Sequence, residues 1–145
     1  MSSEENKAKI RRIIEEVANK GNMAVADEVI DKNYVYHGSG GQEYKGPEGF
    51  KQYMAAVRKA FPDVHMTIED MVAEGDKVVN SVRMKGTFKG EFMGMAPTGK
   101  QVDMSMVNVS RFAGNKEAEA WQYIDTLSMM QQLGAAPPEG QQAKR

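Results

Sequence analysis

The chain has 145 residues, in which 19 Lys and Arg nearly balance 20 Asp and Glu. This length suits one domain with a hydrophobic core, and the balanced charge argues against binding to nucleic acid or to an anionic membrane. The absence of cysteine excludes disulfides and thiolate chemistry, and two histidines are few for a metal centre, so we expect no metal site.

No apolar stretch approaches the roughly 20 residues that a membrane-spanning helix needs. Residues 1–9 are polar where a signal peptide would be apolar. We therefore expect a soluble, cytoplasmic protein.

Three helices are predicted in the first half of the chain. Apolar residues spaced three and four apart predict an amphipathic helix over residues 10–18 and a shorter one over residues 23–30. Between this pair and the next helix lie a brief extended piece, residues 34–37, and a Gly-rich loop, residues 38–41. Gly46-Pro47-Glu48 then predicts the start of a third helix, because proline suits the first helical position.

The second half of the chain is typical of β-strands. Apolar residues alternate from position 64 onward, most clearly over residues 78–92, and a Gly- and Pro-containing hairpin connection follows. In residues 101–112 the alternation changes phase, which indicates a bulge or a strand buried on both faces. A last strand, residues 116–125, leads into a short helix, residues 127–133.

Three helices followed by four antiparallel strands predict an α+β domain with helices over one face of the sheet. We expect the domain to occupy residues 1–134. The remaining residues, 135–145, are rich in Pro, Gln and Gly and predict a disordered tail.

Several segments carry a resemblance to one family. The stretch KGEFMGMAPTGK, residues 89–100, resembles the hairpin of SnoaL-like ester and polyketide cyclases, in the nuclear transport factor 2-like superfamily. The segments GPEGFKQYMAAVRKAFPDV and WQYIDTLSMMQQLG are similar to the same family in order and spacing, and the likeness covers roughly residues 6–134.

This resemblance implies a cone-shaped, cystatin-like α+β barrel: a curved antiparallel sheet with three N-terminal helices, a short C-terminal helix and a deep pocket. It also implies a homodimer packed through the sheets. In the characterised cyclases an aspartate removes an acidic proton from a polyketide ester without metal or cofactor. That aspartate corresponds to Asp125, in the W-x-x-x-D pattern that begins at Trp121, and His37 matches a pocket position.

Two interpretations of Asp125 remain open from the residues alone. An apolar wall would raise its pKa toward the range that a general base needs, and Trp121 and Tyr123 share its strand parity, so all three side chains could face one cavity. Alternatively, Asp125 caps the last helix. His37 could relay a proton, or it could be a polar residue beside the Gly-rich loop.

The remaining candidates would line a binding pocket. Asn80 interrupts an apolar strand face, so it needs a ligand there or a partner within the protein. Aromatic and methionine side chains would either contact a flat, greasy ligand or belong to the core, and these are Tyr36, Tyr53 and Met84.

Three residues depart from the family pattern. Many members carry Arg-Trp where this chain has Ser81-Val82, and a histidine where it has Phe88. Phe88 would make the pocket more hydrophobic and remove an ionisable group from it.

The leading hypothesis is an enzyme of the ester cyclase type, in which Asp125 abstracts a proton next to a carbonyl of a hydrophobic small molecule and His37 helps to stabilise the enolate. The product would be an aldol-type ring or an isomer. One alternative is a noncatalytic protein that binds a small hydrophobic ligand, and another is a hydrolase that activates water.

Overall fold

The computed structural model describes residues 3–134. The predicted tail, residues 135–145, lies outside the described residues.

The N-terminal helices cover the inner side of the sheet. Helix α1, Ser3–Arg12, continues without a break into the π-helix η1, Ile13–Asn19, and Gly21 follows with a positive φ of 75°. Helices α2, Ala24–Val29, and α3, Gly46–Ala60, come next. The predicted apolar stripes are buried, as at Val17, Val29 and Val57, because these faces pack on the sheet and on one another.

The sheet of the described chain has six strands in the order β2-β1-β6-β5-β4-β3. Their bounds are Ile30–His37 for β1, Glu43–Lys45 for β2, His65–Glu74 for β3, Lys77–Thr87 for β4, Gln101–Ala113 for β5 and Lys116–Tyr123 for β6. The prediction of four antiparallel strands was therefore incomplete. The extended piece before the Gly-rich loop is part of a full strand, β1, which lies parallel to β6 and antiparallel to β2.

Strand β4 has the predicted alternation, since Val78, Asn80, Val82 and Met84 are all buried. The prediction for β5 was wrong. This strand pairs with β4 without a register shift, and from Val102 to Phe112 every second residue is buried except the half-buried Asn108, so its outer-face residues include the exposed Val107. The shift lies instead between β5 and β6.

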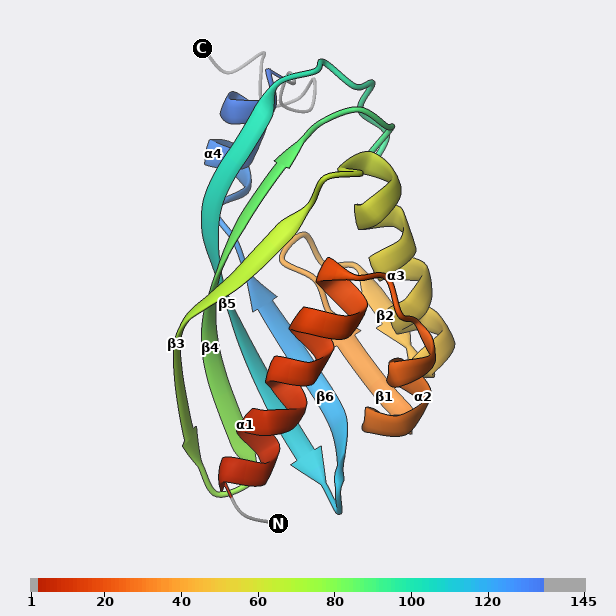
Figure 1. Cartoon of the computed structure of the whole chain (residues 1–145), viewed down its shortest axis with the longest axis vertical. Helices are drawn as coiled ribbons and strands as arrows, with labels where there is room; N and C mark the ends of the chain where they lie inside the picture. The colour runs from red at the N-terminus through yellow and green to blue at the C-terminus, as the bar shows by residue number, and fades with distance from the viewer. Residues whose placement is uncertain (1–2, 135–145) are drawn as a thin grey trace.

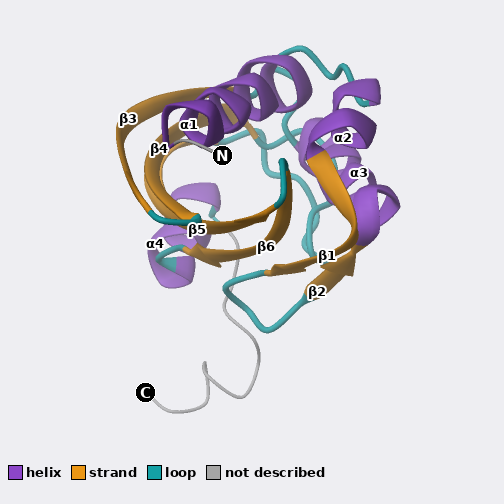
Figure 2. Ribbon diagram, turned by 90° about the horizontal axis from the view of Figure 1, so that it is seen from below, coloured by secondary structure: helices purple, strands orange, loops and turns teal. Residues whose placement is uncertain are grey.

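The sheet curls around the N-terminal helices, and Figures 1 and 2 show α1 and α3 on its hollow side. The linear strand order leaves β2 and β3 as edges, so over residues 3–134 the sheet is curved but not closed into a barrel. Helix α4, Thr126–Leu133, buries Met129 and Leu133 in the same core. Within these residues, every helix is too short or too polar to cross a membrane.

Candidate functional site

A cavity of about 340 Å³ opens between helix α3, the hollow face of the sheet and helix α4. The Gly-rich loop and the 91–93 segment complete its wall. We call it the large cavity. Its lining is mainly apolar, which suits a hydrophobic ligand, and includes Tyr44, Tyr53, Val57, Phe61, Met66, Met84, Phe92, Met93, Met106, Ile124 and Met129.

One polar pair lies inside this apolar lining. The Gln122 side-chain amide donates a 3.0 Å hydrogen bond to the Tyr53 hydroxyl and a 3.4 Å bond to the Met106 sulfur. An amide and a phenol at the cavity wall can orient a carbonyl group of a ligand.

A second cavity of about 60 Å³, the small cavity, lies between the first helix and the sheet. It shares four lining residues with the large cavity, namely Tyr53, Met66, Met106 and Gln122. The sheet supplies it with polar groups: Asn80, Asn108, Ser110 and Glu117.

Glu117 is the most unusual group of the small cavity, because it is a carboxyl side chain only 4% exposed. Burial raises its pKa from 4.5 to about 7, and a hydrogen bond with Ser110 partly opposes that rise. Sequence reasoning missed Glu117. Strand alternation gives it the parity of Trp121 and Tyr123, and only a register shift of β6 against β5 turns it inward.

Asp125 has the geometry of a helix cap. Its side chain is exposed, and Oδ1 accepts a 3.0 Å hydrogen bond from the backbone N–H of Ser128. Both chain neighbours, Ile124 and Thr126, line the large cavity, so Asp125 lies at its rim. Capping is therefore observed, and the catalytic role stays a prediction.

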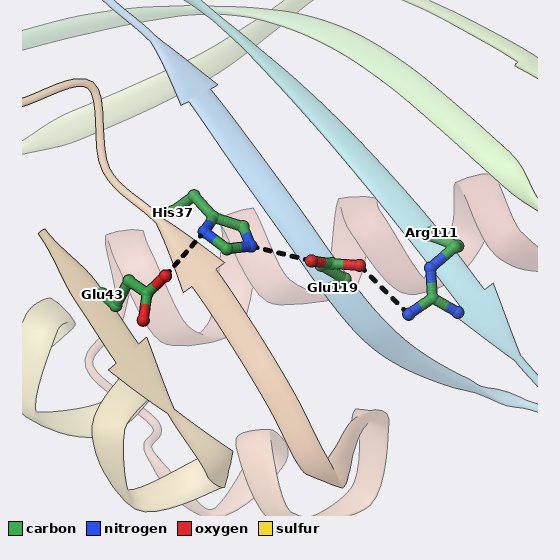
Figure 3. A network of polar contacts seen from close by, with 4 residues as sticks. All are labelled: His37, Glu43, Arg111 and Glu119. Carbon is green, nitrogen blue, oxygen red and sulfur yellow. Dashed lines mark hydrogen bonds and ion pairs between the residues drawn. The ribbon is translucent and has the colours of Figure 1, made fainter. Parts of the chain in front are cut away.

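His37 lies on the outer face of the sheet, because its neighbour Tyr36 points inward to the small cavity. Its Nε2 is 2.7 Å from Glu119 and its Nδ1 is 3.3 Å from Glu43 (Figure 3). Arg111 donates a 3.2 Å bond to the other oxygen of Glu119. His37, and after it Arg111, hold the pKa of Glu119 below its ordinary value.

The expectation that Trp121 and Tyr123 face the cavity beside Asp125 is corrected. Trp121 stacks on His37 with ring centroids 5.4 Å apart, and Tyr123 is 57% exposed, both on the outer face. The even-numbered residues of β6, Ala120 and Gln122, point into the cavities instead.

The other predicted residues divide between the cavities and the core. Met84 lines the large cavity, Tyr36 and Asn80 the small one, and Tyr53 both. Asn80 accepts a 3.3 Å hydrogen bond from the Asn108 side chain, so its partner lies within the protein. Phe88 is fully buried and stacks on Phe61, with centroids 5.6 Å apart.

Between residues 3 and 134, His, Asp and Glu side chains form no group of three or more that could hold a metal ion.

Comparisons of this chain with known protein families and structures agree with this architecture. The family model for SnoaL-like polyketide cyclases matches residues 8–133. No curated protein gives a significant match.

Among solved structures, a proposed polyketide cyclase from Acidithiobacillus ferrooxidans is 35% identical, with a TM-score of 0.79 over 94% of this chain and 100% of that one. A proposed SnoaL-like polyketide cyclase from Jannaschia sp. CCS1 is 26% identical, with a TM-score of 0.85 over 93% and 95% of the two chains. A Catenulispora acidiphila protein with a ketosteroid isomerase-like fold is 20% identical, with a TM-score of 0.74 over 88% and 93% of the two chains. The nuclear transport factor 2-like fold expected from the sequence is confirmed.

Proposed function

This chain belongs to the SnoaL-like polyketide cyclase family, and from that premise we propose that it is a cyclase or isomerase that needs no cofactor. Its substrate is a hydrophobic small molecule that carries a carbonyl group. The observation that carries the proposal is the apolar large cavity, which has the Gln122 amide and the Tyr53 hydroxyl in its wall and Asp125 at its rim.

The proposed reaction begins when a carboxylate removes a proton from the carbon next to the carbonyl, which leaves an enolate. The enolate carbon then attacks a second carbonyl of the same molecule, and the resulting alkoxide takes a proton back. Asp125 is the proposed base, because its two chain neighbours line the large cavity. Gln122 and Tyr53 would stabilise the enolate oxygen, a role that the sequence suggested for His37.

Proton abstraction can be tested before the natural substrate is known. Carbonyl compounds that raise the melting temperature of the protein, chosen from aromatic polyketide esters and steroid ketones, are incubated with it in D₂O. NMR then follows deuterium exchange at the carbon next to the carbonyl. We expect exchange to be accelerated, and Asp125→Asn to slow it by about 100-fold or more.

The matched control is Asp125→Ser, because serine and asparagine both cap helices but neither is a base. Equal loss of exchange in both variants, with unchanged melting temperatures, supports catalysis by Asp125. Exchange at the wild-type rate in both variants would exclude Asp125 as the base.

A ligand-binding protein without turnover is the second candidate. Two observations favour it: Asp125 already caps α4, and Phe88 is buried against Phe61 and brings no ionisable group to the site. In that case ligands would stabilise the protein with no exchange above the uncatalysed rate.

We also propose that the chain forms a homodimer through the outer face of the sheet. Val79, Val107 and Tyr123 are exposed there, and Val107 and Tyr123 lie side by side across β5 and β6. Analytical ultracentrifugation of the full chain and of Val107→Lys tests this: the variant should be monomeric, and a monomeric wild type would contradict the proposal.

A further inference from the structure

The small cavity combines two buried groups that have more hydrogen-bonding capacity than the fold uses. The first is the Tyr34 hydroxyl, on a residue 1% exposed, which has no hydrogen-bond partner among residues 3–134. A buried hydroxyl without a partner is costly and is rare in proteins, so its presence in a cavity wall calls for a functional explanation.

The second group is the Glu117 carboxyl. It lines the small cavity together with Tyr34, whose pKa is raised first by burial and then by the negative charge of Glu117. Because the pKa of Glu117 is itself about 7, this carboxyl can either donate or accept a hydrogen bond at neutral pH. The bulge in β6 makes this arrangement possible by turning Glu117 into the interior.

The small cavity adjoins the large one, because the two share part of their walls. Two of the four residues in their shared wall are methionines, Met66 and Met106, whose flexible side chains can repack around a ligand. The side of the small cavity formed by the first helix is apolar, with Ile10, Ile13 and Ile14, so a ligand entering it would meet most of its polar groups on the sheet side.

We propose that the small cavity is a subsite for the oxygen-bearing end of the ligand, a hydroxyl or a carbonyl, which hydrogen-bonds to Tyr34 and Glu117. The apolar body of the ligand fills the large cavity. This inference rests on the proposed function for the class of ligand, and it adds that the substrate carries a second oxygen group, distant from the reacting carbonyl.

Two probes test the subsite, 4-phenylphenol and 4-methylbiphenyl, which have nearly the same shape but end in a hydroxyl or a methyl group. Calorimetry at pH 7 gives their affinities. We expect the wild type to bind the phenol about tenfold more tightly, as one buried hydrogen bond would give. Equal affinities, or no binding of either probe, would overturn the proposal.

Variants then test whether Tyr34 and Glu117 cause the preference for 4-phenylphenol over 4-methylbiphenyl. Tyr34→Phe should reduce the preference and at the same time raise the melting temperature of the free protein, because it removes the unpartnered hydroxyl. Glu117→Gln, which keeps the side-chain shape, should reduce the preference and its dependence on pH. The matched control is Tyr123→Phe, which removes a hydroxyl on the outer face, away from both cavities, and should leave the preference unchanged.

A preference that is undiminished in Tyr34→Phe would overturn the subsite, and so would a lower melting temperature of that variant. The outcome is independent of the exchange assay. If the probes are distinguished but no carbonyl compound exchanges deuterium, the subsite stands and the enzymatic proposal fails. If exchange occurs but the probes bind equally, the enzymatic proposal stands and the subsite fails.

Discussion

Glu117 of β6 lies opposite Phe112 of β5, whereas the adjacent pair is Arg111 with Glu119, so two residues of β6 match one of β5 at this point. The extra residue reverses the side-chain alternation of β6. Glu119 therefore remains on the outer face with His37, while Glu117 enters the core.

The inward position of Glu117 predicts a specific pH dependence of stability. Its pKa is 4.5 when exposed and about 7 in the folded protein, so between these values the unfolded chain loses the proton first. The free energy of unfolding should therefore fall as pH rises from about 4.5 to about 7, by up to roughly 3 kcal/mol, and this loss should persist at higher pH. Urea unfolding of wild type and Glu117→Gln at pH 5 and pH 8 measures it. The variant should lack this decline, and identical pH dependence of the two proteins would contradict the prediction.

Glu119 should affect the pH dependence of stability in the opposite direction to Glu117. Because its folded pKa is lowered by His37 and Arg111, its contribution to stability is present above the unfolded pKa and is lost as pH falls through the folded value. Glu119→Gln should cost about 1 kcal/mol at pH 7, since the partners are partly screened by solvent, and less at pH 3.5. The matched control is Asp103→Asn, in the more exposed pair with Arg83, which should cost less than Glu119→Gln in the same urea experiment.

The cap at Asp125 predicts that alanine at this position lowers stability and that asparagine or serine does not. Asp125→Ala should lower the free energy of unfolding by about 1 kcal/mol, because the N–H of Ser128 loses its acceptor, whereas Asp125→Asn and Asp125→Ser should stay close to wild type. Chemical denaturation monitored by circular dichroism gives these values. If alanine were as stable as serine at this position, the cap would contribute nothing to the fold.

The segment that follows β4 should not tolerate a side chain at Gly90. A Cβ at this position would lie 2.5 Å from the backbone oxygen of Lys59, and the N–H of Gly90 donates to Ala60 at the end of α3. Gly90→Ala should therefore destabilise the protein by about 1–3 kcal/mol and weaken binding in the large cavity, whose wall includes the adjacent Glu91 and Phe92. Thermal unfolding and calorimetry test both effects. Lys89→Ala, at the exposed preceding residue, is the control and should leave both unchanged.

The sequence by itself determined the helices, the alternation of β4 and the family. Helical spacing and strand alternation are local properties, so the burial of Val17, Val57 and Val82 could be predicted from neighbouring residues. The family segments likewise predicted the curved α+β fold that the structure and its relatives share.

Only the tertiary structure decided which face of β6 forms the cavities. Trp121, Tyr123 and Glu117 have one parity in the sequence, but the first two lie outside and the third inside, because register and bulges depend on pairing with distant strands. The same reason explains His37: the sequence identifies a histidine at a strand end, and the pairing of β1 with β6 brings it next to Glu119 and Trp121 on the outer face.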